Sequence, residues 1–297
     1  MIEVHTSDLT EPCPRRVELR LAGKRIGETT SALMWGQVWH EARAGCYAAG
    51  VWDELRAAGI LIDAWNKCVA ENIKNRMPLT EAVVKNESAT KAEIAKYLAA
   101  YGERVAPRVK KMIGQELPIR CTIIVDGEAV EFASHLDVLF RDHTGRLTLD
   151  DDKTGDEAPT MDYLRRNKQL GIYAYAIRHG TVWVDGEPVE FGEWPIVNWI
   201  HVPGMRTYGR KTTIKEVDFT SGELVERVYE KGEARPIERV VMTAPIHEQR
   251  AASIVSDFAQ HVRMRRLGIM PAMPTKTGCF LCDSRVHCES YQHEERY

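Results

Sequence analysis

The organisation of the chain can be worked out from one stretch, Leu147-Thr148-Leu149-Asp150-Asp151-Asp152-Lys153-Thr154-Gly155. Apolar and polar residues alternate in it, which predicts a short strand that runs into a loop at Gly155. Side chains two positions apart on a strand share a face, so Asp151 and Lys153 should project together, and Asp150 and Asp152 the other way. A carboxylate can hold a hard divalent cation, and an ammonium beside it can stabilise negative charge on a phosphate. Most isolated D-x-K triplets are solvated surface, so the meaning of this one depends on the rest of the chain.

A predicted hairpin comes just before this stretch. The segments 119–125 and 129–140 are rich in strand-forming residues, and they flank Asp126-Gly127, a typical hairpin turn. Asp137 is an acidic residue inside the otherwise apolar second segment. A buried carboxylate needs a partner or a cation, although Asp137 could instead face solvent at a strand edge. Neighbouring antiparallel strands lie about 5 Å apart, so Asp137 and Asp151 could share one ion.

A helix is predicted after Gly155, from Thr160 to Arg178, and His179-Gly180 should end it. Gln169 and Tyr173 lie one turn apart on this helix and could border the carboxylates. Its first half also carries a basic cluster, which is either a nucleic-acid contact or an ordinary solvated face. The residues of that cluster are Arg165, Arg166 and Lys168.

The sequence that follows predicts a hairpin over 182–187, a strand over 196–202 and a helix over 246–267. Between the last two lies 204–215, which we interpret as a phosphate-contacting loop with Tyr208 as a stacking residue. A solvated turn is the alternative. The basic residues of this segment are Arg206, Arg210, Lys211 and Lys215.

The N-terminal part of the chain is predicted to be helical. Pro14 suits the first position of a helix that ends near Gly23, and Thr29-Thr30-Ser31 can cap a second helix. In that second helix Gly36 and His40 lie one turn apart, so another segment could approach closely above His40. The imidazole could ligate a metal, whereas a hydrogen-bonded core histidine is the commoner case.

Two further helical segments follow before the strands. One is predicted over 51–75. The second begins at the capping box Thr90-Lys91-Ala92-Glu93 and runs towards Met112, with Pro107 kinking or ending it.

The overall composition is that of an ordinary globular protein. The chain has 297 residues, enough for one large domain or two small ones, with a net charge of −3 and a pI of about 6.4. This balance does not favour a non-specific nucleic-acid coat, but it allows a local basic groove. No apolar run is long enough to span a membrane and the N-terminus does not look like a signal peptide, so we expect a cytoplasmic protein without membrane partners.

Seven cysteines are present, and three of them are clustered near the C-terminus. Cys279 and Cys282 are separated by two residues, and Cys288 follows soon afterwards, which is the spacing of a metal or iron–sulfur site. Such a site needs a fourth ligand. From the residues alone the candidates are Cys13, His287, Cys46, Cys68 and Cys121.

Taken together, these features resemble the PD-(D/E)XK nuclease superfamily, RecB-like branch, and more closely the CRISPR-associated and phage-encoded exonucleases that carry a four-cysteine iron–sulfur cluster. Each motif is weak, but their order along the chain is that of the family, over nearly the whole chain from Cys13 to Cys288. The motifs are Cys13-Pro14, Gly36 to His40 as G-x-x-x-H, Asp137, Asp151 to Gly155 as D-x-K-T-G, Gln169 to Tyr173 as Q-x-x-x-Y, and Cys279, Cys282 and Cys288.

The resemblance implies an α/β (α+β) fold with a restriction-endonuclease-like core, in which a central mixed sheet is flanked by helices. It predicts a single nuclease domain over 1–297, with a helical N-terminal insertion at 28–115, the nuclease core at 116–220, and iron–sulfur-stapled termini at 13 and 270–290. It also implies a 4Fe-4S cluster held by Cys13, Cys279, Cys282 and Cys288, although four thiolates could equally hold zinc. The family more often has an apolar or aromatic residue at the position of Asp152, and Asp151 is preferred as the ligand because it shares a face with Lys153.

The expected function is that of a metal-dependent DNA exonuclease that acts on single-stranded ends. His40, Asp137, Asp151 and the carbonyl of Asp152 would hold Mg²⁺ or Mn²⁺. Lys153, Gln169 and Tyr173 would be the catalytic residues, with Tyr173 either behind Gln169 or stacked on a base. DNA contacts are expected from Arg165, Arg166, Lys168, Arg206, Arg210 and Lys211, and recombination or CRISPR-adaptation proteins as partners. The alternatives are a non-catalytic DNA-end-binding or CRISPR-adaptation subunit of the same fold, and a zinc-containing DNA-binding protein.

Overall fold

The fold is known from a computed structural model that describes residues 3–5, 8–9, 13–22, 28–155, 167–203, 210–217, 223–232, 235–242 and 244–268. The helices are α2 (Pro14–Leu21), α3 (Ser31–Ala49), α4 (Glu54–Lys74), α5 (Glu81–Lys85), α6 (Glu87–Arg104), the 3-10 helix η1 (Ala106–Arg108), α8 (Lys168–His179) and α9 (Ala244–Arg266). The strands are β1 (Glu3–His5), β2 (Lys111–Val125), β3 (Glu128–Arg141), β4 (Leu147–Gly155), β5 (Thr181–Val184), β6 (Glu187–Val189), β7 (Ile196–Pro203), β8 (Thr212–Val217), β9 (Leu224–Tyr229) and β10 (Glu238–Met242).

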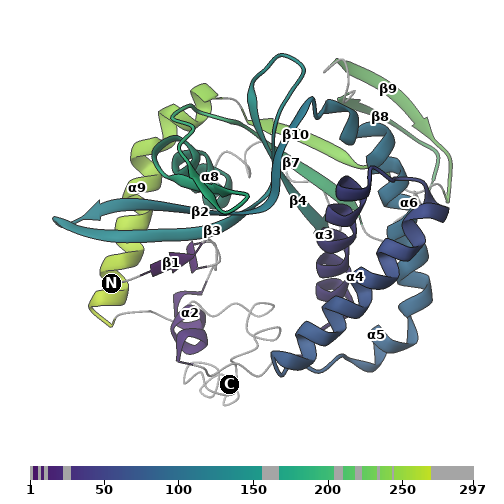
Figure 1. Ribbon diagram of the computed structural model, residues 1–297, viewed down its shortest axis with the longest axis horizontal. Helices are drawn as coiled ribbons and strands as arrows, with labels where there is room; N and C mark the ends of the chain where they lie inside the picture. The colour runs from purple at the N-terminus through teal and green to yellow at the C-terminus, as the bar shows by residue number, and fades with distance from the viewer. Residues whose placement is uncertain are drawn as a thin grey trace.

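An eight-stranded mixed sheet forms the centre of the molecule (Figure 1). Its strand order is β10-β7-β4-β3-β2-β5-β6, and β1 pairs with β3 beside this path. The strands β2, β3 and β4 form an antiparallel meander, whereas β4 and β7 run parallel. A parallel pair needs a crossover connection, and α8 is part of the segment that provides it.

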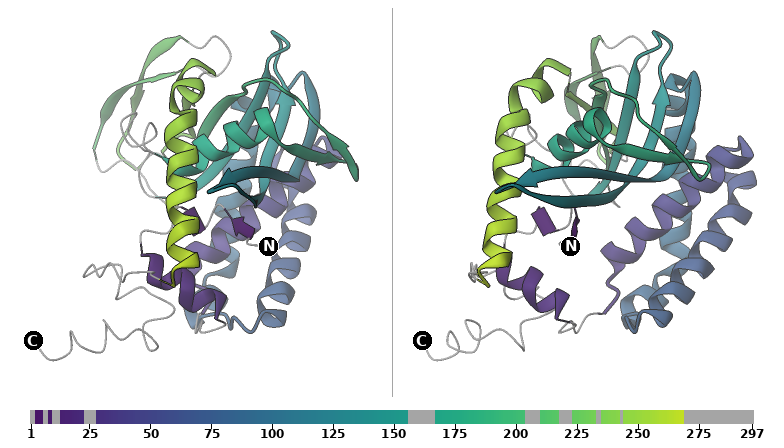
Figure 2. Two further views of the ribbon diagram at one scale, coloured as in Figure 1. Left: turned by 90° about the vertical axis from the view of Figure 1, so that its left-hand side faces the viewer. Right: turned by 60° about the vertical axis from the view of Figure 1, so that its left-hand side comes forward.

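Helices cover both sides of this sheet. Figures 1 and 2 show α8 and α9 on one side and α3 to α6 on the other. On the first side, apolar residues of β2 and β3 such as Ile119 and Phe132 pack in one core with Ile172 of α8 and Phe258 of α9. The second core lies among the other helices and includes Ile200 of β7. The predicted class, a mixed sheet flanked by helices, is therefore confirmed.

Strand β4 lies deep in the sheet because it pairs with β3 on one edge and with β7 on the other. Its residues from Leu147 to Asp152 are all buried, and they include three aspartates in succession. Buried carboxylates cost free energy unless they are paired, so each of the three must find a partner. The positions of the residues that pair with these three aspartates determine the geometry of the site.

The hairpins form where the sequence predicts them. Asp126 and Gly127 both have positive φ, 54° and 81°, as a two-residue turn with the twist of the flanking strands requires. Asp185 and Gly186 repeat this geometry between β5 and β6. The predicted loop over 204–215 is wrong in its last part, because Thr212–Val217 forms β8, which pairs with β9 in a separate two-stranded sheet.

The helices agree with prediction except at some of their ends. Thr30 caps α3 by accepting a hydrogen bond from the Leu33 N–H, as predicted. The predicted start at Thr90 is wrong, because α6 begins at Glu87 and Thr90 is buried one turn inside it. The prediction that Pro107 ends this helix is confirmed, since η1 replaces the α-helix there. Of the helix predicted over 160–178, the part before residue 167 lies outside the described residues. Among the described helices, none is long and apolar enough to cross a membrane.

Candidate active site

Two aspartates lie opposite each other on neighbouring strands. In the β3–β4 pair, Val138 is the partner of Asp150, so Asp137 lies opposite Asp151. Asp151 is fully buried and Asp137 nearly so. The structure thus brings the two acidic residues together as the sequence suggested.

Asp151 and Lys153 project from one face of β4, two positions apart. The Lys153 Nζ lies 2.8 Å from both carboxylate oxygens of Asp151. Gln169 of α8 donates a hydrogen bond from Nε2 to Asp151 Oδ1 at 3.3 Å. The lysine is therefore fixed by the carboxylate, and the carboxylate by the glutamine.

Tyr173 lies behind Gln169. Its hydroxyl accepts hydrogen bonds from Gln169 Nε2 at 3.1 Å and from Ser134 Oγ at 3.3 Å. The side chain is buried, with 4% exposure. Of the two roles predicted for Tyr173, this burial and these contacts favour the place behind Gln169 over stacking on a base. Its contacts are those of a residue that orients Gln169.

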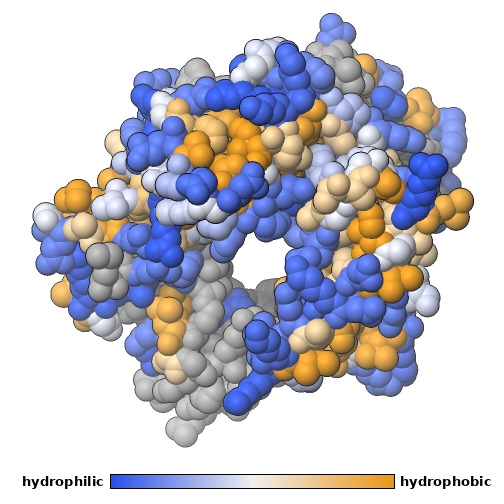
Figure 3. All heavy atoms as spheres, viewed as in Figure 1, coloured by the Kyte–Doolittle hydropathy of each residue, from blue (hydrophilic) through white to orange (hydrophobic). Residues whose placement is uncertain are grey.

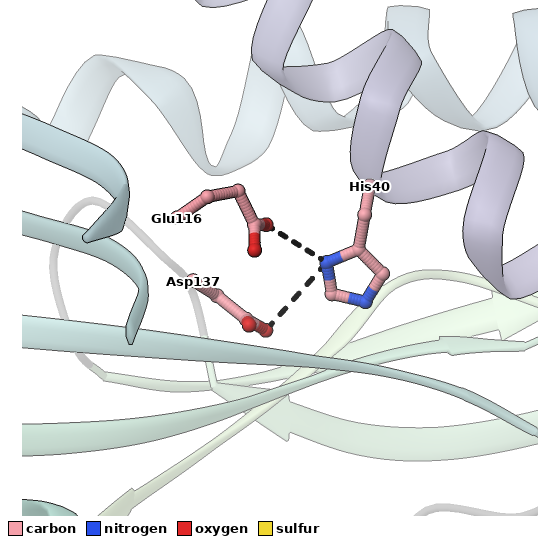
Figure 4. A group of neighbouring side chains, drawn as sticks. All are labelled: His40, Glu116 and Asp137. Atoms are coloured by element: carbon pink, nitrogen blue, oxygen red, sulfur yellow. Dashed lines mark ion pairs between the residues drawn. The ribbon is translucent and has the colours of Figure 1, made fainter. Parts of the chain in front are cut away.

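His40 of α3 faces the carboxylates of Glu116 and Asp137 (Figure 4). Its Nδ1 lies 3.8 Å from Asp137 Oδ2 and 3.4 Å from Glu116 Oε1. One ligand atom from each of His40, Glu116 and Asp137 can be chosen so that all lie within 4.8 Å of one another. Such a set of oxygen and imidazole ligands is able to hold a divalent cation.

Glu116 was not among the predicted site residues. Its backbone has a φ of 48°, which is uncommon for a residue other than glycine. The signal that could have found it is the hairpin register. Counting outward from the Asp126-Gly127 turn places position 116 opposite Asp137, and the observed pair of Leu117 with Leu136 follows the same count.

Asp152 points away from Asp151, as the alternation of the strand predicts. Its backbone N–H donates to Asp137 Oδ2 at 2.8 Å. Its side chain lies against α3, where Oδ2 accepts a hydrogen bond from Trp39 Nε1 at 3.1 Å and lies 2.6 Å from Arg43 Nη1. Its carboxylate is therefore committed to α3.

Asp150 has a different pair of partners. Its Oδ2 forms an ion pair with Arg108, and its Oδ1 accepts a hydrogen bond from Asn198 Nδ2 at 2.6 Å. The carboxylate is therefore used to join β4 to β7 and to the segment before β2.

The electrostatics of the site follow from burial and close charges. Burial, together with Asp137, raises the pKa of Asp151 to about 7, although Lys153 opposes this. Burial acts to lower the pKa of Lys153, but Asp151 and Asp137 outweigh it, so the pKa is raised and the ammonium stays charged. Burial likewise acts to lower the pKa of His40, but Asp137 and Glu116 raise it above its ordinary value. Asp151 and His40 therefore both hold protons more tightly than usual.

The charges present also fit a divalent cation. The carboxylates of Glu116, Asp137 and Asp151 meet here, and Lys153 supplies one fixed positive charge against them. The nearby charge of Arg43 is largely taken up by Asp152. A divalent cation would offset the remaining negative charge, and the oxygen and imidazole ligands suit Mg²⁺ or Mn²⁺.

The remaining predicted site residues are placed differently. Lys168, at the start of α8, lies 3.8 Å from Asp257 of α9, and Lys211 pairs with Glu230 at 2.6 Å. Arg210 is exposed just before β8. Cys13 directly precedes α2 and is half-buried. The predicted residues that lie outside the described residues are Arg165, Arg166, Arg206, Tyr208, Cys279, Cys282, His287 and Cys288.

A mixed sheet whose adjacent strands present Asp137 and the Asp151–Lys153 pair, with a histidine from a covering helix, defines a class of metal-dependent phosphodiester hydrolases. The chain belongs to the PD-(D/E)XK nuclease superfamily, whose family model matches residues 8–289. Members of this superfamily are nucleases that typically use Mg²⁺ or Mn²⁺, and their substrate is DNA.

Two solved structures match most of the chain, and the first of them shows a similar fold. A candidate exonuclease from Eubacterium rectale is 11% identical with a TM-score of 0.51, and the match covers 98% of this chain and 87% of that one. The crystal structure of SSO0001 is 13% identical with a TM-score of 0.39, over 97% of this chain and 86% of that one. No curated protein matches the chain.

Proposed function

We propose that this nuclease is a RecB-like exonuclease that hydrolyses DNA from single-stranded ends. The observation that carries the proposal is the convergence of Asp137, Asp151 and Lys153 from adjacent strands with His40 of α3. A protein that only bound DNA would have no need of a lysine held against a carboxylate in this position, so the arrangement favours catalysis.

Each residue of the site has a separate role in the proposed reaction. His40 and Asp137, which lie close together with Glu116, would hold Mg²⁺ or Mn²⁺. Asp151, opposite Asp137 on the neighbouring strand, and the carbonyl of Asp152 would complete the ligand set. When bound, such a cation lowers the pKa of water and neutralises charge on the scissile phosphate. Lys153 presents a charged ammonium where negative charge develops in the transition state.

Gln169 and Tyr173 position the Asp151–Lys153 pair. The hydrogen bond from Gln169 to Asp151 fixes the carboxylate, and Tyr173 holds the Gln169 amide in turn. A supporting layer of this kind matters because small misplacements of reacting groups are costly in rate.

The surface near the site supports a single strand as the substrate. Figure 3 shows an opening between α3 and the side of the sheet formed by β2 and β3, and where the described residues line it they are mostly hydrophilic. The site residues come from these same elements. Its hydrophilic lining suits a charged polymer such as a single-stranded end. The likeness in fold to a candidate exonuclease is in keeping with action on ends.

The second part of the proposal is a structural 4Fe-4S cluster held by Cys13, Cys279, Cys282 and Cys288 within a single nuclease domain. The other cysteines of the described residues are poorly suited as ligands. Cys46 and Cys68 lie inside the apolar core among the N-terminal helices, and Cys121 lies inside the core between the sheet and α8 and α9. Burial also raises the pKa of all three thiols. Half-buried Cys13, before the first described helix, is the better candidate.

The function is tested with single strands and duplexes labelled at the 5′ or the 3′ end, incubated with Mg²⁺, with Mn²⁺ or with EDTA. We expect stepwise shortening from one end of the single strand that stops in EDTA. Binding of ends without cleavage in either metal would favour the non-catalytic alternative. Iron and acid-labile sulfide in anaerobically purified protein separate the cluster from zinc.

A further inference from the structure

Arg43 is a fully buried arginine of α3, one turn after His40. Its Nη1 lies 2.6 Å from Asp152 Oδ2. Its Nη2 lies 3.3 Å from Glu116 Oε1 and 3.4 Å from the carbonyl oxygen of Asp137. One guanidinium therefore touches three strands, β2, β3 and β4, and each contact is made at or beside a group of the candidate cation site.

Asp152 completes this connection from the strand side. Its carboxylate holds Arg43, while its backbone N–H holds the carboxylate of Asp137. Trp39 donates a hydrogen bond to the same Asp152 oxygen that Arg43 contacts, so two residues of α3 hold this carboxylate. A shift of α3 along β4 would break these contacts and move His40 away from Asp137.

We infer that Arg43 is a positioning residue for the cation site: through Asp152 it fixes α3 on β4, and through its second amino group it aims Glu116 at His40 and Asp137. This inference rests on the proposed function, because it assumes that these groups bind a divalent cation. Arg43 itself touches neither substrate nor cation.

The chemistry of the side chain explains why an arginine is present. A buried ion pair that served stability alone could be replaced by apolar residues of similar volume at little cost. The planar guanidinium can instead hold two acceptors at once in fixed directions, which a lysine ammonium on a flexible stem does less well. Partners that orient metal ligands in this way typically change metal affinity about 10- to 100-fold when they are removed.

The test measures binding of Mn²⁺ alone to the full chain, by the loss of the free Mn²⁺ signal in electron paramagnetic resonance. Arg43→Lys keeps the charge but loses the second contact, so we expect Mn²⁺ binding weakened by about 10- to 100-fold. The double variant Arg43→Met with Asp152→Asn removes the pair without leaving a buried charge, and it should lose as much affinity while remaining folded by circular dichroism. Cleavage by Arg43→Lys should need correspondingly more Mn²⁺, yet approach the wild-type rate at saturation.

The matched control is the double variant Arg108→Met with Asp150→Asn, which removes the neighbouring buried pair from the same strand. It should bind Mn²⁺ as the wild type does, even if its melting temperature falls. Wild-type affinity in both Arg43 variants, or an equal loss in the control, would overturn the inference. If the wild type itself does not bind Mn²⁺, the proposed function fails, and the role of Arg43 fails with it. That result differs from a wild type that binds Mn²⁺ and Arg43 variants that bind it equally well, which would overturn the role of Arg43 alone.

Discussion

At the scale of single residues, the Asp151–Lys153 pair is the part of the site on which cleavage should depend most. Asp151→Asn and Lys153→Met keep the size of each side chain but remove its charge. We expect cleavage to fall by at least about 100- to 1,000-fold in either variant, because Asp151→Asn weakens a cation ligand and Lys153→Met removes a charge that stabilises the transition state. The measurement is the initial rate on end-labelled single strands, with melting curves as a check of folding.

Lys67→Met is the matched control for that pair. Lys67 also contacts a carboxylate, Glu41 at 2.7 Å, but it lies exposed between α3 and α4. Its rate should equal that of the wild type. A wild-type rate in Lys153→Met would contradict the assignment of Lys153.

The raised pKa of Asp151 predicts how stability depends on pH. A carboxyl group with a folded-state pKa of about 7 and an ordinary value of 3.8 holds more protons in the folded state between these values. Its contribution to stability is therefore full below about pH 3.8 and is lost as pH rises through about 7. Melting curves of the metal-free protein from pH 5 to 8 should show this loss, and Asp151→Asn should make the loss smaller. An unchanged pH profile in that variant would show that Asp151 ionises normally.

Much of the site could be predicted at this scale, because alternation on a strand is a local rule. Asp151 and Lys153 share a face and Asp152 points away, as two-residue periodicity requires. Glu116 was missed because its role depends on an unusual φ and on the register of a hairpin. Arg43 could not have been found from its neighbours in sequence, since its partners lie on three strands that follow α3 in the chain.

At the scale of elements, the contact of α3 with the end of β4 depends on a glycine. A Cβ at Gly36 would lie 3.2 Å from Thr154 Oγ1, whereas a Cβ at Gly59 of α4 would meet nothing within 4 Å. Gly59→Ala should therefore gain the full helix propensity of alanine, about 1 kcal/mol in the free energy of unfolding. Gly36→Ala should gain less, and it should slow cleavage by displacing Thr154, next to Lys153. Urea unfolding measures the free energy of unfolding of both variants. Equal gains would show that α3 is not closely packed against Thr154 at Gly36.

Prediction of elements was good where local signals were strong and poor where they competed. The turns at Asp126-Gly127 and Asp185-Gly186 have little alternative conformation, so both hairpins were predictable. The capping box at Thr90 was misleading because the helix starts earlier, and tertiary packing buries Thr90 inside α6. The strand β8 was missed because its sequence is short and polar, and its pairing with β9 decides its conformation.

At the scale of the whole molecule, the proposed cluster would close a loop of nearly the entire chain. Cross-links that close long loops stabilise by restricting the unfolded state, on the order of 4–5 kcal/mol by analogy with disulfides. Cys13→Ser should therefore lower the melting temperature about as much as Cys282→Ser, and both should lose iron and the brown colour. Cys46→Ser, Cys68→Ser and Cys121→Ser should keep their iron. Full iron content in Cys13→Ser would exclude Cys13 and leave His287 as the better fourth ligand.

The pairing of the first strand has a consequence for how the protein is made. β1 joins the sheet beside β3, and Arg265 of α9 donates a hydrogen bond to the Glu3 carbonyl oxygen at 2.8 Å. Arg263 and Arg266 of the same helix pair with Asp126 at the β2–β3 turn. On the ribosome, the beginning of the chain emerges first, but its last support is synthesised more than two hundred residues later. A translational pause before α9 should therefore leave β1 more open to proteases than β4 and β7, which are already paired on both edges.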